Sequence, residues 1–274
     1  MYSRVYVEIT NVCNMHCSFC HSHSRAPRQM TEAEYVRILE QLTGKTQYLY
    51  HHLMGEPLLH PELPRFLHLA KQAGFHPMLT TNGTLLERLG DQILTDGLHK
   101  VNISLHSFEK DDLAAHRAYV QTVAAFAQKA NQKGVLISLR LWNNGCDDGK
   151  NATALQVLQE TFTGHWVENS RGYRIRDGLF LEWGDRFIWP DKDAPKGDDH
   201  LSCHGLRDHF GILSDGTVVP CCLDSDGVMA LGNVFRQELD DILDSPRAKT
   251  IADGFRNRKA TEDLCRRCAY ARKF

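Results

Sequence analysis

The sequence lacks an excess of either charge and any long apolar run. Its 32 Lys and Arg against 34 Asp and Glu give a formal net charge of −2 over 274 residues, so no global field attracts nucleic acid or an anionic membrane. No apolar run approaches the roughly 20 residues that span a bilayer, and charges interrupt the apolar residues of Met1–Glu8, unlike a secretory signal. We therefore expect a cytoplasmic protein with neither a membrane nor nucleic acid as its partner.

The sequence also lacks the features of a disordered or disulfide-stapled chain. With 42% hydrophobic and 24% charged residues, its composition is that of an ordinary globular protein. Nine cysteines are an odd number, they gather toward the two ends of the chain, and no secretory signal precedes them. A disulfide framework is therefore not expected, and metal binding is the better interpretation. Cys146 stands outside both groups, and we interpret it as an inert thiol.

Strand-like and helix-like segments alternate along the first two thirds of the chain. The strands are expected at Val5–Ile9, Tyr48–Leu53, His76–Thr81, Val101–Ser107, Val135–Trp142 and Leu179–Trp189. The helices are expected at Thr31–Thr43, where Thr31 and Glu34 form a capping box, and at Pro61–Ala73, Leu85–Leu94, Tyr119–Gln132 and Ala152–Phe162. This alternation predicts βαβ units and an α/β fold with a parallel sheet.

A change in composition marks a boundary near residue 195. Pro190–His200 has the prolines, glycine and charges of a linker. Beyond it, Asp215-Gly216 between apolar runs predicts a hairpin over Gly211–Pro220, and residues 236–252 are expected to form one helix. We therefore predict an α/β domain over residues 1–195 and a small cysteine-bearing domain over residues 196–274.

Three cysteines directly follow the first expected strand. Cys13, Cys17 and Cys20 have the spacing C-x3-C-x2-C and lie where parallel α/β proteins build active sites, at the carboxyl end of a strand. A structural zinc site prefers four ligands, whereas three thiolates on a [4Fe–4S] cube leave one iron open for a substrate or cofactor. Zinc binding remains the alternative at this point.

This cluster, with the aromatic Phe19 before its last cysteine, resembles that of the radical S-adenosylmethionine (SAM) superfamily. After the second strand, Met54-Gly55-Glu56-Pro57 is similar to the family's Gly-Gly-Glu-Pro motif, with Met54 in place of the first glycine. The resemblance implies that Gly55 and Glu56 bind SAM. A carboxylate such as that of Glu56 suits the methionine ammonium through a charge-assisted hydrogen bond.

Later strand ends extend the same resemblance. Thr80–Gly83 is similar to the family's Thr-Asn-Gly strand end. By resemblance, Ser104 on the fourth strand contacts SAM, Arg140 on the fifth meets its carboxylate, and Asn143 meets its ribose. The family's fold would make residues 1–195 a partial (β/α)6 barrel, similar to a TIM barrel, with a small hairpin-and-helix iron–sulfur module after it.

The second group of cysteines resembles the auxiliary-cluster module called SPASM or twitch. Cys203, Gly216 and Cys221 have the spacing C-x12-G-x4-C, and Cys265 and Cys268 follow as C-x2-C. Only four cysteines fit, so the shorter twitch form with one auxiliary [4Fe–4S] cluster is the better match. The spacing selects Cys221 over Cys222, whose side chain would point to the opposite side of an extended segment.

The resemblance implies a radical SAM oxidoreductase that needs a reductant such as flavodoxin or ferredoxin. SAM would be cleaved to a 5′-deoxyadenosyl radical that takes a hydrogen atom from a substrate, and the auxiliary cluster would accept an electron as the substrate is oxidised or cross-linked. The sequence identifies no catalytic residue on the substrate side.

The class of substrate and two non-catalytic functions stay open. A peptide or protein is one possible substrate, and a small molecule similar to a sugar or aminocyclitol is the other. Because the first strand begins within about four residues of Met1, no leader-peptide-binding domain is expected before it. This favours a small molecule, or a peptide delivered by a separate partner. A non-catalytic iron–sulfur electron carrier and a zinc-binding protein are the remaining alternatives.

Overall fold

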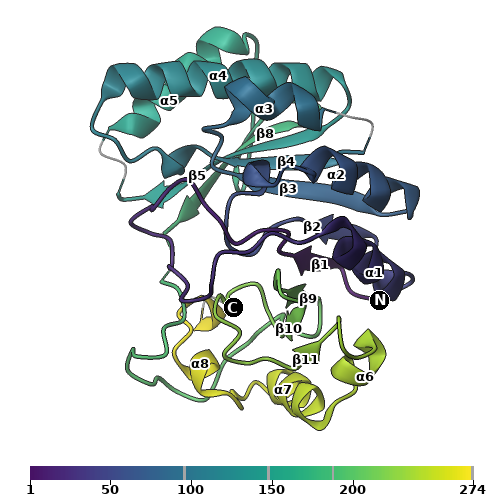
Figure 1. Cartoon of the computed structure of the whole chain (residues 1–274). Coiled ribbons are helices and arrows are strands. Elements are labelled where there is room, and N and C mark those ends of the chain that lie inside the picture. Colours follow the sequence, from purple (N-terminus) through teal and green to yellow (C-terminus); the bar gives the residue numbers. More distant parts are fainter. Residues whose placement is uncertain (95–96, 147–148, 187, 273–274) are drawn as a thin grey trace. The chain divides into compact units, whose positions relative to one another are not determined.

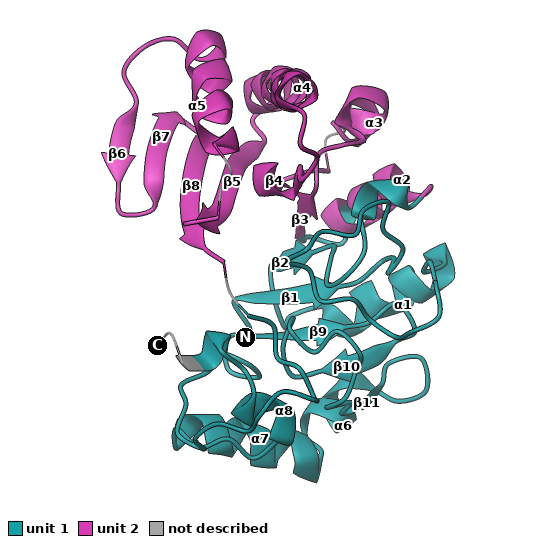
Figure 2. Cartoon of the chain, turned by 90° about the vertical axis from the view of Figure 1, so that its left-hand side faces the viewer, with its two compact units in different colours: residues 1–60, 72–75, 187–274 teal, residues 61–71, 76–186 magenta. Residues whose placement is uncertain are grey.

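The computed structural model describes residues 1–94, 97–146, 149–186 and 188–272, in which strands and helices alternate (Figure 1). Contacts divide the chain into two compact units, and each is described by itself (Figure 2). Unit 1 contains residues 1–60, 72–75 and 187–274, and unit 2 contains residues 61–71 and 76–186. The boundary near residue 195 stays a prediction. Within the described ranges, no helix has both the length and the apolar character needed to cross a bilayer.

The sheet of unit 1 is centred on the first strand of the chain. Its order is β11-β10-β9-β1-β2, with β1 parallel to both of its neighbours and β10 antiparallel to β9 and β11. The strands are β1 (Arg4–Val7), β2 (Tyr48–Tyr50), β9 (His209–Ile212), β10 (Thr217–Val219) and β11 (Gly232–Asn233). The antiparallel β9–β10 pair is the hairpin predicted from Asp215-Gly216.

Some of the helices of unit 1 begin at residues whose side chains cap them. They are α1 (Glu32–Leu42), the 3-10 turn η1 (Pro57–Leu59), α6 (Leu239–Leu243), α7 (Pro246–Arg256), α8 (Asp263–Arg266) and η3 (Tyr270–Arg272). The Thr31 capping box predicted for α1 is present. The helical segment expected over residues 236–252 is present but interrupted, because α6 ends at Leu243 and α7 begins at Pro246. Pro246 has no N–H to continue a helix from α6, and the Ser245 hydroxyl instead caps α7 at the Ala248 N–H.

Unit 2 is a sheet with helices on one face (Figure 2). Its order is β3-β4-β5-β8-β7-β6, parallel from β3 to β8 and antiparallel over the last three strands. The strands are β3 (His76–Thr81), β4 (Lys100–Ser104), β5 (Leu136–Asn144), β6 (Val167–Asn169), β7 (Gly172–Arg176) and β8 (Leu179–Asp185). The helices are α2 (Leu63–Gln72), α3 (Leu86–Ile93), η2 (Leu105–Ser107), α4 (Leu113–Gln132) and α5 (Lys150–Thr161). The sequence did not predict β6 and β7.

Alternation along the strands of unit 2 separates an apolar face from a polar one. Val101 and Ile103 on β4, and Leu139 on β5, are fully buried. Residues two apart share a face of a strand, so Ser104 and Arg140 project from the opposite face. The helices therefore cover the apolar side, and the polar side is available for chemistry.

Candidate functional site

The three predicted cluster cysteines lie on the long irregular loop between β1 and α1. The Cys20 N–H donates to the Cys17 carbonyl over 3.0 Å, which folds the last part of the motif into a turn. Burial, followed by the charge of Cys13, raises the pKa of the Cys20 thiol. The turn brings Cys17 and Cys20 together, and the effect of Cys13 on the Cys20 thiol indicates that these two cysteines are also near each other. All three thiols are free of disulfides.

The neck of this loop is closed by two polar side chains that follow β1. The Asn11 amide donates to the Ala26 carbonyl over 2.9 Å and accepts from the Arg28 N–H over 2.7 Å. The Thr10 hydroxyl donates to the Arg28 carbonyl over 3.2 Å. Residues 10–11 and 26–28 are thus held together, which fixes where the cysteine-bearing part of the loop leaves the sheet.

The Met54–Pro57 turn lies directly against this neck. The Glu56 N–H donates to the Val12 carbonyl over 2.8 Å, one residue before Cys13. Gly55 has φ +77°, and a Cβ atom there would lie 2.4 Å from the Thr10 carbonyl oxygen. The Glu56 carboxylate is 2% exposed and accepts from the Leu58 N–H over 3.1 Å. The local fold therefore brings the predicted SAM-binding carboxylate beside the three-cysteine motif.

Arg140 lies in the middle of a polar row in unit 2. The strand register places Ser104 on β4 and Glu182 on β8 directly opposite it. Its Nε atom lies 3.5 Å from the Glu182 carboxylate, and its guanidinium stacks 4.4 Å from the centre of the Trp142 ring. Both contacts restrict the arginine side chain to one place on this face.

Two further polar groups surround this row. His106 Nδ1 lies 3.1 Å from the Arg140 carbonyl oxygen, and burial lowers the pKa of this imidazole, which favours its neutral form. Asn143 exchanges two amide hydrogen bonds of 3.1 Å with Asn151 on α5. Neither Glu182 nor Asn151 was predicted as a partner.

The six predicted SAM-binding residues divide between the units. Phe19, Gly55 and Glu56 belong to unit 1, whereas Ser104, Arg140 and Asn143 belong to unit 2. The unit 1 residues lie in the loops that follow β1 and β2, whereas Ser104 ends β4, Asn143 is next to the end of β5, and Arg140 is in the middle of β5.

The four predicted auxiliary cysteines interact with one another inside unit 1. Burial is the largest cause of the raised pKa of Cys203, Cys221 and Cys265, and neighbouring thiols raise each further. The charges that raise the pKa of Cys221 are those of Cys222, then Cys203 and Cys265, and the charge of Cys268 raises the pKa of both Cys203 and Cys265. A Cβ atom on Gly205 would lie 2.9 Å from the Pro220 carbonyl, so the Cys203 segment runs against the segment before Cys221.

Cys222 shares Cys203 as a neighbour with Cys221, but it has further partners outside the cysteine set. Its thiol hydrogen-bonds with the Tyr6 side chain and packs on a buried apolar cluster that includes Leu53 and Val219. Burial raises the pKa of this thiol to about 11, despite the hydrogen bond to Tyr6 and the charge of Arg4. This arrangement supports Cys221 as the ligand.

The donor chemistry fits iron–sulfur clusters at both places. Three thiols share one loop and four share the C-terminal module, and soft thiolates are the usual ligands of such clusters. Within the described ranges, no three His, Cys, Asp or Glu side chains lie close enough to hold a single metal ion. A cube of four irons spaces its thiolates more widely than one tetrahedral zinc ion does.

Comparison with known families agrees with this donor set. The model of the radical SAM superfamily matches residues 7–141, and that of the SPASM iron–sulfur cluster-binding domain matches residues 203–269. The chain belongs to the radical SAM superfamily and carries a SPASM-type domain in its C-terminal part. Membership implies [4Fe–4S] clusters and SAM as its cofactors.

Curated relatives include proteins named GTP 3′,8-cyclase. That of Chlorobaculum tepidum is 33% identical over 112 residues, which cover 39% of this chain and only 34% of the relative. The probable GTP 3′,8-cyclase of Methanococcus maripaludis strain C6 is 32% identical over 278 residues, covering 85% of this chain and 89% of the relative.

Solved structures share the fold at low identity. BtrN in complex with AdoMet and 2-DOIA is 18% identical with a TM-score of 0.63, covering 98% of this chain and 93% of that one. Streptococcus suis SuiB bound to the precursor peptide SuiA is 14% identical with a TM-score of 0.62, covering 98% and 70%. These likenesses confirm the predicted α/β fold of the partial-barrel type.

Proposed function

We propose that this chain cleaves SAM reductively at the Cys13, Cys17 and Cys20 cluster and oxidises or cross-links a substrate by hydrogen-atom abstraction. The observation that carries this proposal is the pairing of a three-thiol loop with a separate four-thiol set. Three ligands leave one iron for SAM, whereas four ligands leave none, which suits electron transfer.

The residues of the chain bind and orient SAM in this proposal. Glu56 accepts from the methionine ammonium, and its burial strengthens that charge-assisted bond. Arg140, restrained by Glu182 and Trp142, meets the carboxylate. Ser104 and Asn143 contact the nucleoside part, Asn143 from a position fixed by Asn151. Phe19 packs beside the cluster.

A cluster held by Cys13, Cys17 and Cys20 would supply one electron to SAM, which would be cleaved to methionine and a 5′-deoxyadenosyl radical. A substrate C–H bond breaks and its hydrogen atom moves to the 5′ carbon. A cluster held by Cys203, Cys221, Cys265 and Cys268 would accept one electron from the substrate radical, and the proton would go to solvent. Flavodoxin or ferredoxin in the cytoplasm is the proposed reductant.

A second candidate is the radical cyclisation of a purine nucleotide. It is favoured by the M. maripaludis relative, whose similarity extends over most of this chain. The two candidates differ in substrate. The cyclisation would consume GTP, whereas the oxidation of another small molecule or of a peptide would leave GTP unchanged.

The test is anaerobic reconstitution with iron and sulfide, followed by assay of 5′-deoxyadenosine. Replacement of Cys13, Cys17 and Cys20 by Ala should remove about half of the iron and all SAM cleavage. Cys146→Ser is the matched control and should change neither, because Cys146 is exposed and outside both motifs. A colourless wild-type protein that binds zinc would contradict the proposal. GTP-dependent stimulation of 5′-deoxyadenosine formation would favour the second candidate.

A further inference from the structure

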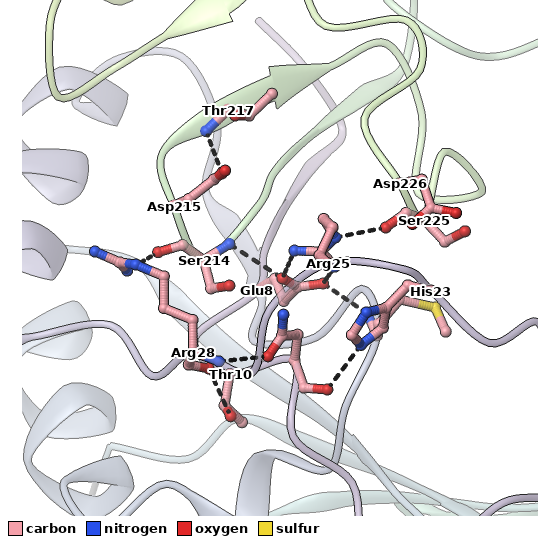
Figure 3. Close-up of polar contacts among 12 residues, drawn as sticks. Glu8, Thr10, His23, Arg25, Arg28, Ser214, Asp215, Thr217, Ser225 and Asp226 are labelled. Atoms are coloured by element: carbon pink, nitrogen blue, oxygen red, sulfur yellow. Dashed lines mark hydrogen bonds and ion pairs between the residues drawn. The ribbon is translucent and has the colours of Figure 1, made fainter.

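Glu8 immediately follows β1, and its side chain is completely buried. Figure 3 shows it beside Arg25 and Ser214. Its two carboxylate oxygens each accept from one terminal nitrogen of Arg25 over 2.7 Å. They also accept from the Met54 N–H and the Ser214 N–H, both over 3.1 Å. One carboxylate therefore receives four hydrogen bonds from three separate segments of the chain.

These three segments all serve the proposed site. Arg25 is five residues after Cys20 on the three-cysteine loop, and Met54 is two residues before Glu56. Ser214 is in the turn of the β9–β10 hairpin, which leads directly to Cys221. Glu8 is thus the point where the loop, the SAM-binding turn and the C-terminal module meet.

A second set of contacts ties the loop to the C-terminal module. The Arg25 Nε–H donates to the Ser225 carbonyl over 2.7 Å. The N–H and hydroxyl of Ser24 both donate to one oxygen of Asp226, over 2.7 and 3.0 Å. Residues 225 and 226 follow Cys221 by only four and five positions. These contacts therefore join the segment that follows Cys20 to the segment that follows Cys221.

The energetics make this connection sensitive to its charges. Arg25 is 13% exposed and Glu8 is not exposed at all. In such a pair, removing one partner leaves an uncompensated buried charge, which is much more unfavourable than losing an exposed ion pair. A chain that loses the Glu8 charge must release Arg25 toward water, and the cysteine-bearing segment would move with it.

We infer that Glu8 is a positioning residue through which the C-terminal module fixes the geometry of the three-cysteine loop and the Glu56 turn. This inference rests on the proposed assignment of Cys13, Cys17 and Cys20 to the SAM-cleaving cluster. Glu8 itself touches no reacting atom in this scheme. It acts by holding Arg25 and the Met54 backbone.

The test compares Glu8→Gln with Glu262→Gln in the reconstituted full chain. Glu262 is the control for the three-cysteine loop, because it forms a bidentate pair with Arg247 at 2.9 Å in the same unit. Since Glu262 precedes the helix that carries Cys265, the two variants are compared by SAM affinity and by exchange over residues 20–28. Glu8→Gln should keep its iron but weaken SAM binding by at least about tenfold, as expected when a group supporting a metal site is removed. It should also change the electron paramagnetic resonance signal that SAM addition produces, and accelerate hydrogen exchange over residues 20–28.

A merely structural pair would lower the melting temperature of both variants and leave SAM affinity, the resonance signal and exchange over residues 20–28 as in the wild type. That result would overturn the inference. Failure of wild-type protein to bind SAM would instead contradict the proposed function, while hydrogen exchange would still report on the loop.

If Glu8→Gln does not fold, Asp226→Ala tests the same connection without leaving a buried charge. Because Asp226 is only partly buried, it should weaken SAM binding by about threefold. Unchanged affinity and unchanged exchange over residues 20–28 would then contradict the inference.

Discussion

At the scale of single residues, Gly55 shows how closely the SAM-binding turn approaches the first strand. Gly44 and Gly55 share φ +77°, but an added Cβ meets nothing within 4 Å at Gly44 and lies 2.4 Å from a backbone oxygen at Gly55. The two glycines therefore separate the effect of conformation from the effect of contact.

We expect Gly44→Ala to lower the free energy of unfolding by about 1 kcal/mol, from the left-handed conformation alone. Gly55→Ala should lower it by about 3 kcal/mol, because the backbone of Thr10 must also move. Chemical denaturation of both variants under anaerobic conditions measures the difference. Equal losses would show that the turn tolerates a side chain against the strand.

Residue patterns predicted local chemistry better than long-range pairing. The Cys13–Cys20 spacing and the Glu56 turn could be read from short motifs, and the structure places Glu56 beside Val12 as a continuous site requires. The hydrogen bonds of Glu8 could not be predicted, because its partners are distant in sequence. Arg25 is 17 residues away and Ser214 is 206 residues away. A lone acidic residue at a strand end carries no signal of such a partner.

At the scale of elements, β9 joins β1 with two basic residues opposite each other. The register pairs Arg4 with His209. Burial, then the charge of Arg4, lowers the pKa of His209 to about 4, although the nearby Asp208 opposes this and His204 adds to it. Tyr6 packs against the same imidazole ring.

This arrangement predicts that the folded protein becomes less stable as the pH is lowered. Below its ordinary pKa of 6.5, His209 takes up a proton in the unfolded chain but not in the folded one until about pH 4. The free energy of unfolding should therefore drop by about 2 kcal/mol between pH 7 and pH 5 from this group. The Asp208 carboxyl, whose pKa is lowered to about 2, changes the free energy of unfolding only below pH 5. His209→Gln should flatten the slope in denaturation curves, and an unchanged slope would contradict the assignment.

Elements with strong local signals were predicted, and those without them were not. The Thr31 capping box and the Asp215-Gly216 turn gave α1 and the β9–β10 hairpin nearly to the residue. The β6 strand was missed because its three residues are all exposed and show no apolar alternation. The break between α6 and α7 was missed because the apolar spacing continues past Pro246, although proline at a helix start is a recognised signal.

At the scale of the whole molecule, two cysteine sets imply two clusters that can be removed separately. The three-thiol loop is at one end of the sequence and the C-x2-C pair is at the other. The two proposed clusters therefore have no protein ligand in common. Loss of one cluster should have a different effect on activity from loss of the other.

Wild-type protein should hold about eight irons per chain, as two cubes of four. Cys265→Ala with Cys268→Ala should remove about half of them, spare at least part of the SAM cleavage and abolish product formation, because the substrate radical would have no electron acceptor. Iron analysis and 5′-deoxyadenosine assay measure this, with Cys146→Ser as the control. Normal turnover by the double variant would contradict the role of the auxiliary cluster.

The parallel pairing of β1 with β9 also affects how the chain matures during synthesis. Residues 4–7 leave the ribosome about 200 residues before their partners at 209–212. At about 5–20 residues per second, the nascent first strand waits roughly 10–40 s for that neighbour. Glu8 waits equally long for Ser214. We therefore expect the three-cysteine loop to reach its final geometry, and to accept iron and sulfide, only after residues 209–214 have been synthesised.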